Sequence, residues 1–380
     1  MTSGGNGPEV LEAGPRRVPP GTRRRRLLLL AAVVVVLLLA GVTTRVLGPD
    51  APAGAQAPSP TPTASDRPSS APASTRAVPT TPVVLPRAAA PVPGFPRGDL
   101  YARDAQHLYR VELATGRVTA TAADVRSGSP VALLPVRDGV VLRPLDPVPG
   151  LRVPDGWPAR ELQGRLRTST QVLPGPGDRL WVSELFDGRS SEFALTDADG
   201  RPLGDSVREN GYFAADATGG LLLVDNAGVW ERRHRSWHRI SPGILVAAGR
   251  AQHLLARCEG DRCATYRYDR RTGVTTRVLR ATPLISGGGS LSPDGRFVAT
   301  ATSVVGEPVT QVVEVATGRV LTRVVTRTAA ETSSQLVWSA DGSRLLGLDD
   351  GQLFVLDLSS GRVVRPDVGL PDLLGIALRP

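Results

Sequence analysis

The chain has 380 residues, of which 41% are hydrophobic, 4% aromatic and 21% charged. Its 41 glycines and 34 prolines exceed average usage, which excludes a coiled coil, a helical bundle and a channel of many membrane spans. Two cysteines are too few for a miniprotein built on disulfides or for a four-cysteine zinc site.

The net charge of +9 is distributed unevenly along the chain. Residues 1–26 carry six arginines against two glutamates, whereas residues 99–380 carry 34 arginines against 32 acidic residues. A nucleic-acid-binding domain concentrates its positive charge on the folded part, where phosphates are neutralised. Here the excess lies beside an apolar segment, so the sequence argues against nucleic acid as a partner.

Residues 27–44 read LLLLAAVVVVLLLAGVTT, a run of 18 residues without a charge. As a helix this run would be about 27 Å long, close to the hydrocarbon thickness of a bilayer. Four arginines directly precede it, which places the N-terminus in the cytoplasm and the rest of the chain outside. We therefore expect a single-pass protein of the cell membrane, with a transmembrane helix (signal-anchor) over 27–44 and a disordered cytoplasmic tail over 1–26.

A cleaved signal peptide is the alternative interpretation of the apolar run. Its apolar region would normally be shorter, and the best cleavage site, at 53–55, lies some way downstream. No cysteine follows the run closely, which excludes a lipoprotein anchor. Residues 45–97 are rich in proline, alanine, serine and threonine without apolar periodicity, and predict a disordered linker that holds the next domain away from the membrane.

From Gly98 onward, short apolar segments alternate with Gly, Asp and Pro, which is typical of an all-β fold with many strands. The phrase VELATGRV (111–118) recurs along the chain in degenerate form. It predicts seven hairpin turns at these positions: Gly116, Gly150, Gly200, Ser236, Gly273, Gly318 and Gly361. Their mean spacing of about 41 residues suits a four-stranded propeller blade, and blades must stack into a ring to bury both of their faces. We expect a β-propeller of seven blades over 98–380, with six or eight as alternatives.

A second phrase, LSPDGRFVAT (291–300), is echoed by WSADGSRLLGL (338–348). In both, Ser-x-Asp-Gly predicts a type I turn before the next strand. Together the two phrases resemble the WD40-like repeats of the TolB-like β-propeller superfamily, most closely over residues 288–366. The resemblance implies the fold and a role in protein–protein contacts, but no particular activity, because propellers host unrelated functions.

The two ends of the predicted ring complement each other. The first unit, which begins at residue 99, lacks an upstream strand, and the C-terminal segment 373–380 has no hairpin of its own. We expect the C-terminal segment to complete the first blade, which would close the ring without an exposed edge.

Cys258 and Cys263 frame the sequence CEGDRC between two predicted strands. In an extracytoplasmic domain this spacing predicts a disulfide that joins the two strands of a hairpin, with free thiols as the alternative. His253 is the one histidine nearby in the sequence, so we expect no metal site here.

The segment RRHRSWHR contains the densest local cluster of basic residues. It forms a candidate anion-binding patch, suited to phosphate-bearing wall polymers or lipid headgroups, of these residues: Arg232, Arg233, His234, Arg235, His238 and Arg239. A solvated hairpin, with Trp230 and Trp237 packed between blades, is the favoured alternative. His234 and His238 would be about 13 Å apart on a strand, too far to bind one metal ion.

No sequence motif nominates a catalytic centre. The chain contains neither G-x-S-x-G nor H-E-x-x-H, and the acidic turn 197–200 lacks the later ligands of a calcium loop. We predict no catalytic residue, cofactor or metal, and favour a membrane-tethered binding or scaffold module for an envelope protein or anionic polymer. The alternatives are a propeller enzyme, a lyase or hydrolase with its site at the central channel, and a sensory domain, which the short tail disfavours.

Overall fold

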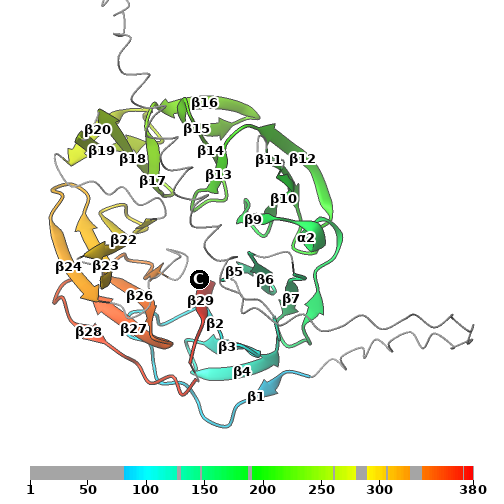
Figure 1. The fold of residues 1–380 in the computed structure, drawn as a ribbon. Helices are drawn as coiled ribbons and strands as arrows, with labels where there is room; N and C mark the ends of the chain where they lie inside the picture. The colour runs from blue at the N-terminus through cyan, green and yellow to red at the C-terminus, as the bar shows by residue number, and fades with distance from the viewer. Residues whose placement is uncertain are drawn as a thin grey trace, which may run out of the picture. The chain divides into compact units, whose positions relative to one another are not determined.

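The computed structural model describes residues 81–125, 130–145, 148–186, 191–259, 262–279, 289–304, 307–325, 336–370 and 372–379. This part of the chain forms seven antiparallel sheets arranged as blades around a central axis (Figure 1). The prediction of an all-β propeller with seven blades is confirmed. The predicted cytoplasmic tail and membrane segment lie outside the described residues, and within the described residues no helix has the length and apolarity to cross a bilayer.

Blades 2 to 4 each contain four strands, which we call a to d from the axis outward. Blade 2 consists of β5 (Val131–Val136), β6 (Gly139–Pro144), β7 (Leu151–Pro154) and β8 (Arg160–Glu161). Blade 3 consists of β9 (Gln171–Pro174), β10 (Leu180–Phe186), β11 (Ser191–Thr196) and β12 (Pro202–Glu209). Blade 4 consists of β13 (Tyr212–Ala215), β14 (Leu221–Asp225), β15 (Gly228–Arg233) and β16 (Ser236–Ser241).

Blades 5 to 7 follow the same order from the axis outward. Blade 5 consists of β17 (Ile244–Ala248), β18 (Gln252–Glu259), β19 (Arg262–Asp269) and β20 (Thr275–Leu279). Blade 6 consists of β21 (Ser290–Leu291), β22 (Phe297–Val304), β23 (Glu307–Glu314) and β24 (Val320–Val325). Blade 7 consists of β25 (Val337–Trp338), β26 (Arg344–Asp349), β27 (Gln352–Asp357) and β28 (Val363–Val364).

Blade 1 is assembled from both ends of the propeller domain. Its sheet runs, from the axis outward, through β29 (Gly375–Arg379), β2 (Asp99–Arg103), β3 (His107–Glu112), β4 (Arg117–Ala122) and β1 (Val83–Val84). The C-terminal β29 pairs with β2 along its whole length, so that Tyr101 lies opposite Ala377. The predicted closure of the ring by the C-terminal segment is therefore found.

The propeller begins before the predicted boundary at residue 98. Val83 of β1 pairs with Ala120 of β4, and Ala89, Val92 and Phe95 are buried in the core. The prolines of this segment conceal it in the sequence, because two residues of β1 suffice to add an edge strand and the rest packs without regular structure.

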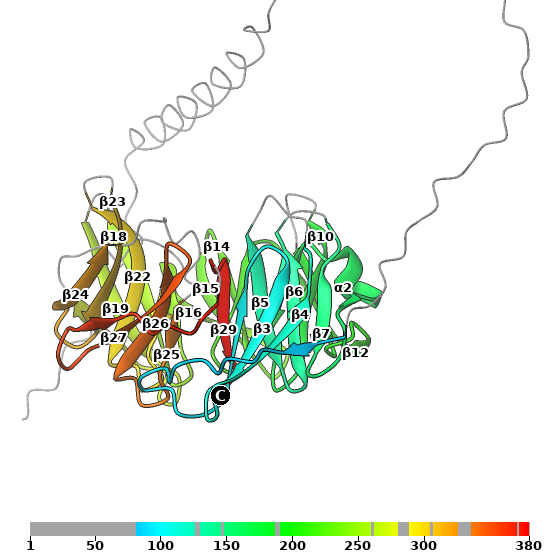
Figure 2. The ribbon, with the colours of Figure 1, turned by 90° about the horizontal axis from the view of Figure 1, so that it is seen from below.

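The antiparallel order gives the ring two distinct faces (Figure 2). In each four-stranded blade the a–b and c–d turns lie on one face, which we call the turn face. The b–c connections and the links between blades lie on the opposite face, which we call the loop face. Residues from neighbouring blades therefore meet on the turn face wherever their hairpin turns approach one another.

Seven apolar clusters form the core of the described propeller, one between each pair of neighbouring blades. The cluster between blades 4 and 5 is the smallest, with four buried members: Val229, Ile240, Leu255 and Tyr268. Buried polar residues complete that interface, and they are described with the candidate site below.

Six of the seven predicted hairpin turns join strands c and d of a blade. Five of them use a glycine with φ between 66° and 84°: Gly116, Gly200, Gly273, Gly318 and Gly361. In blade 4 the turn is made by His234 and Arg235, which themselves have positive φ values of 47° and 72°. In the Ser-x-Asp-Gly phrase, the Ser292 Oγ donates to Asp294 at 2.6 Å and accepts a hydrogen bond from the Phe297 amide at 3.0 Å.

The predicted turn at Gly150 is misplaced. Gly150 lies between β6 and β7, that is, between strands b and c, and the c–d turn of blade 2 contains Gly156 with φ +73° instead. The Gly-Trp-Pro sequence of this turn differs from the repeated phrase, so the repeat pattern predicts the turn at the nearest Pro-Gly pair instead. One short helix that no periodicity predicted, α2 (Gly164–Thr168), connects blades 2 and 3.

Candidate functional site

A cavity of about 850 Å³ lies along the axis of the propeller. It is lined by the innermost strands β5, β9, β13, β17 and by the start of β29. Most lining side chains are apolar, and among the described lining residues Arg143 is the one with a full charge. Arg143 is 4% exposed and its Nη1 donates to the Val148 carbonyl at 3.0 Å. The cavity has the size and character of sites that bind apolar groups.

Three large apolar side chains stand exposed where this cavity opens on the loop face. Leu145 is 58% exposed, Tyr212 62% and Ile244 39%, and all three line the cavity. Leu145 follows strand b of blade 2, while Tyr212 and Ile244 begin strand a of blades 4 and 5. We call these three residues the channel mouth. Exposed apolar residues that converge on a cavity mark interaction sites more often than scattered ones do.

The predicted anion-binding patch is divided by its hairpin. Arg232 forms two hydrogen bonds with Asp205, at 2.8 and 2.9 Å, and its guanidinium stacks over the Trp181 ring at 5.4 Å. Arg233 donates through Nε to Glu231 at 2.7 Å. Both arginines therefore have partners within the chain.

The other four predicted residues of the patch are exposed: His234, Arg235, His238 and Arg239. Arg239 donates to the Ala227 carbonyl and lies over Trp230, 5.9 Å from the ring centroid. Trp237 packs against the cluster between blades 3 and 4, 6.1 Å from the Phe213 ring. This part of the segment matches the favoured alternative, a hairpin whose tryptophans pack between blades.

Arg232 and Arg233 line a second cavity, of about 540 Å³, between blades 4 and 5. We call it the basic cleft, and its lining consists of Glu231, Arg232, Arg233, Arg250, Ala251, Asp269, Arg270 and Arg271. Arg250 lies in the a–b turn of blade 5, and Arg270 and Arg271 lie in its c–d turn, so the cleft opens on the turn face. Sequence reasoning missed these three arginines because they are distant in the chain. The available signal was the pair Arg270 and Arg271 beside the predicted turn at Gly273, because that turn belongs to the blade that follows RRHRSWHR.

Behind the basic cleft lies a buried polar cluster. Asp216 and Glu231 are each 3% exposed and His253 is fully buried. One ligand atom from each lies within 4.8 Å of the others, a grouping that metal sites also show. Here the Arg270 guanidinium occupies it, with Nη2 2.9 Å from Asp216 and Nε donating to Glu231 at 2.7 Å. The cluster is therefore an ion-pair network that joins blades 4 and 5.

The network changes the acidity of Glu231. Burial disfavours the charged carboxylate, but the neighbouring His253, Arg233 and Arg270 outweigh burial and lower the pKa of Glu231 to about 2. His253 Nε2 lies 3.8 Å from the carboxylate, beyond hydrogen-bond length, so the two arginines provide the direct contacts. Glu231 is thus ionised at neutral pH and fixes both guanidinium groups.

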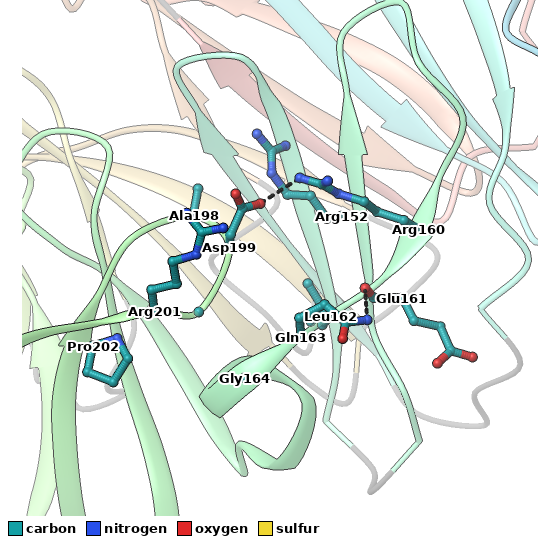
Figure 3. A pocket seen from close by; sticks show the side chains of 11 residues that line it. Arg152, Arg160, Glu161, Leu162, Gln163, Gly164, Ala198, Asp199, Arg201 and Pro202 are labelled. Atoms are coloured by element: carbon teal, nitrogen blue, oxygen red, sulfur yellow. Dashed lines mark hydrogen bonds and ion pairs between the residues drawn. The ribbon is translucent and has the colours of Figure 1, made fainter.

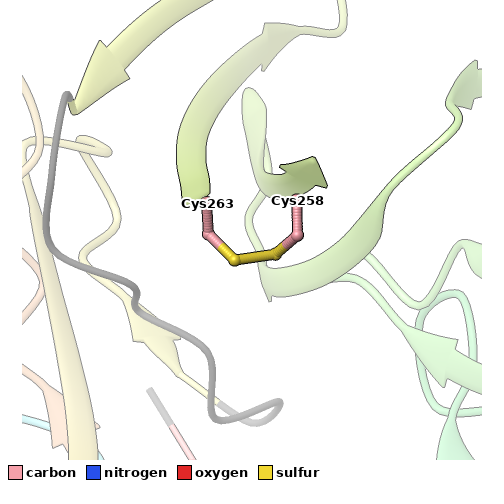
Figure 4. The surroundings of a disulfide bond; sticks show 2 residues. All are labelled: Cys258 and Cys263. Atoms are coloured by element: carbon pink, nitrogen blue, oxygen red, sulfur yellow. A yellow bond between two sulfur atoms is a disulfide. The ribbon is translucent and has the colours of Figure 1, made fainter. Parts of the chain in front are cut away.

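The predicted disulfide joins Cys258 of β18 to Cys263 of β19 (Figure 4). The two residues are paired across the hairpin, with their Cα atoms 4.0 Å apart. They lie at the b–c end of blade 5, on the loop face, so the bond restrains this hairpin at the face that carries the channel mouth.

A smaller cavity, of about 280 Å³, lies between the outer part of blade 2 and the c–d turn of blade 3 (Figure 3). Arg160 donates to Asp199 across it at 2.6 Å, and Gln163 donates to the Glu161 carbonyl at 3.1 Å. The Arg160–Asp199 pair connects blades 2 and 3, and because both of its members are largely exposed it contributes little stability.

Comparison with solved structures finds matches at low sequence identity. Oligogalacturonate lyase from Vibrio parahaemolyticus matches with a TM-score of 0.47 and 8% identity over 74% of this chain and 99% of that one. TolB from Acinetobacter baumannii matches with a TM-score of 0.40 and 13% identity over 73% of this chain and 81% of that one. The seven-bladed fold agrees with the expected resemblance at the level of the fold, and similarity of this degree carries no argument about function. No protein-family model matches the chain, and no curated protein sequence matches it.

Proposed function

We propose that this protein is an extracytoplasmic β-propeller, tethered to the cell membrane by one N-terminal helix, that binds a protein of the cell envelope at its channel mouth. The observation that carries the proposal is the exposure of Leu145, Tyr212 and Ile244 around an apolar cavity. Leaving these side chains in water is unfavourable, and covering them with apolar side chains of a partner removes that cost.

The apolar lining favours a protein over a polymer at this position. A wall polysaccharide or an anionic polymer needs hydrogen-bond donors or positive charge, and the described lining offers one charged side chain, Arg143. A polypeptide segment with apolar side chains matches both the mouth and the cavity below it. In this proposal the propeller binds and does not catalyse, so turnover of a small substrate in the channel would contradict it.

The tether and its orientation rest on residues 1–97 and are tested by topology. In intact cells, a protease added outside should cleave the propeller or the linker, while a tag at the N-terminus should be protected. Permeabilised cells provide the control, because both ends become accessible. Protection of the propeller in intact cells would refute the extracytoplasmic location without bearing on the binding surface.

The binding surface is tested by charge substitution in the full-length protein. The double variant Tyr212→Asp, Ile244→Asp places two carboxylates at the channel mouth, and in-cell chemical crosslinking followed by a pull-down should lose the partner. The matched control is Trp157→Asp, Val274→Asp, since Trp157 and Val274 are 69% and 57% exposed on the turn face. Equal recovery of the partner from both variants would contradict the proposed surface.

A further inference from the structure

The basic cleft carries chemistry that the proposed function does not use. Five of its eight lining residues are arginines, and the other charged ones are Glu231 and Asp269. It opens on the turn face, opposite the channel mouth, and is about 540 Å³ in volume. The cleft is therefore separate from the binding surface proposed on the loop face.

Two of the guanidinium groups are fixed from behind. Arg270 donates to Glu231 through Nε and to the Arg250 carbonyl through Nη1 at 2.9 Å, and its Nη2 contacts Asp216. Arg233 donates to Glu231 and to the Tyr268 hydroxyl. A guanidinium has five N–H donors, so donors remain on both groups after these contacts. Groups held in place before binding lose little conformational freedom on binding an anion.

Two further guanidinium groups belong to exposed residues. Arg250 and Arg271 stand on adjacent turns of blade 5, and neither forms an ion pair among the described residues. Beyond the lining, Asp205 pairs with Arg232, and Asp216 contacts Arg270. Five arginines against Glu231, Asp269, Asp205 and Asp216 leave the region with one net positive charge. Arg250 and Arg271 carry two charges, and the nearby Asp269 offsets one of them.

We propose that the basic cleft binds a phosphate-type oxyanion, through Arg250 and Arg271 together with the remaining donors of Arg233 and Arg270. Two oxygens of a carboxylate are satisfied by one guanidinium, whereas a phosphate offers oxygens to several at once. Convergence of four guanidinium groups on one cavity therefore matches phosphate better than carboxylate. Phosphodiester polymers and phospholipid headgroups share this chemistry.

The test measures phosphate binding by the full-length protein in detergent at low ionic strength. Inorganic phosphate is titrated calorimetrically into the wild type and into Arg250→Gln, Arg271→Gln. Loss of two charge-assisted contacts should weaken binding by about tenfold or more. Both positions are exposed, so the fold should be retained, which a thermal melt of each variant verifies.

The matched control is Arg117→Gln, Arg362→Gln. These two arginines are also exposed, lie at c–d turns of blades 1 and 7, and their replacement removes the same net charge. The six arginines of residues 1–26 contribute an equal background in every variant. The control should bind phosphate as the wild type does. Equal weakening in both double variants, or no phosphate binding by the wild type, would overturn the proposal.

Nanodiscs separate the two sources of phosphate. If an anionic lipid headgroup occupies the cleft, the apparent affinity for inorganic phosphate should be lower in phosphatidylglycerol discs than in phosphatidylcholine discs, and the difference should vanish in Arg250→Gln, Arg271→Gln. An affinity that is the same in both discs assigns the cleft to a soluble phosphate or to a phosphodiester polymer.

Discussion

Arg379 of the last strand contacts Asp99 at the start of β2, with its Nε 3.1 Å from the carboxylate Oδ2. The same guanidinium donates to Asp155 of blade 2 at 2.6 Å and stacks over the Tyr101 ring, whose hydroxyl also donates to Asp155 at 2.8 Å. The ring is thus closed by side chains as well as by the backbone pairing of β29 with β2, and these side chains also connect blade 1 to blade 2.

Replacement of this arginine should weaken closure. In Arg379→Ala, Asp99 and Asp155 lose a partly buried partner, and the free energy of unfolding should fall by about 1–3 kcal/mol. Urea denaturation of the full-length protein in detergent measures the change. The control is Arg87→Ala, whose partner Asp367 is exposed, as is Arg87 itself, and whose expected loss is at most about 0.5 kcal/mol. Similar losses in the two variants would show that the C-terminal contacts do not stabilise the ring.

The disulfide should stabilise the protein modestly, because it closes a short loop. Cys258→Ser, Cys263→Ser should lower the free energy of unfolding by about 2 kcal/mol. Denaturation with and without reductant measures this: the wild type should become less stable in reductant, while the double variant should not respond. A wild type that is insensitive to complete reduction would contradict the expectation.

The low pKa of Glu231 makes a specific contribution to acid stability. Its pKa is about 2 in the folded protein against an ordinary 4.5, so the unfolded chain takes up the proton first as the pH falls. Stability that depends on the ionised carboxylate is therefore present above pH 4.5 and is lost as the pH falls towards about 2. The stability difference between wild type and Glu231→Gln should shrink through this window. If the stability difference stayed constant as the solution is acidified, the ionised carboxylate of Glu231 would not be its source.

The Ser-x-Asp-Gly turns should depend on their serines. Ser292 is 2% exposed, and its hydroxyl accepts the Phe297 amide hydrogen bond, so Ser292→Ala leaves a buried donor without a partner. The free energy of unfolding should fall by about 1–2 kcal/mol. Ser360→Ala, at an exposed turn of blade 7, is the comparison and should cost much less. Equal losses of unfolding free energy in the two variants would mean that the hydrogen bond from the Phe297 amide to Ser292 is not needed for the turn.

The repeated phrases predicted the ring because each encodes a local physical requirement. A glycine such as Gly318, with φ 74°, is needed wherever the c–d turn takes a left-handed conformation, and that need is visible in one repeat at a time. The C-terminal strand could be predicted as well. The first unit lacks a strand and the last segment lacks a hairpin partner, so pairing the two leaves no exposed edge.

The features that the sequence did not reveal depend on contacts between distant residues. β1 is a strand because the edge of β4 is free to pair with it, and Val83 and Val84 among prolines carry no signal of that edge. The basic cleft likewise unites Arg233 of blade 4 with Arg250 and Arg271 of blade 5. Neither the channel mouth nor the cleft has a motif, because each exists only when the blades stand side by side.

Site-specific photo-crosslinking at the channel mouth tests the proposed binding surface most directly. A photo-reactive amino acid replaces Tyr212 in the full-length protein in living cells, and the comparison position is Trp157, an aromatic residue of similar exposure on the turn face. We expect one dominant covalent adduct with an envelope protein from position 212 and none from position 157. An adduct formed equally from both positions, or from position 157 alone, would contradict the proposed binding surface.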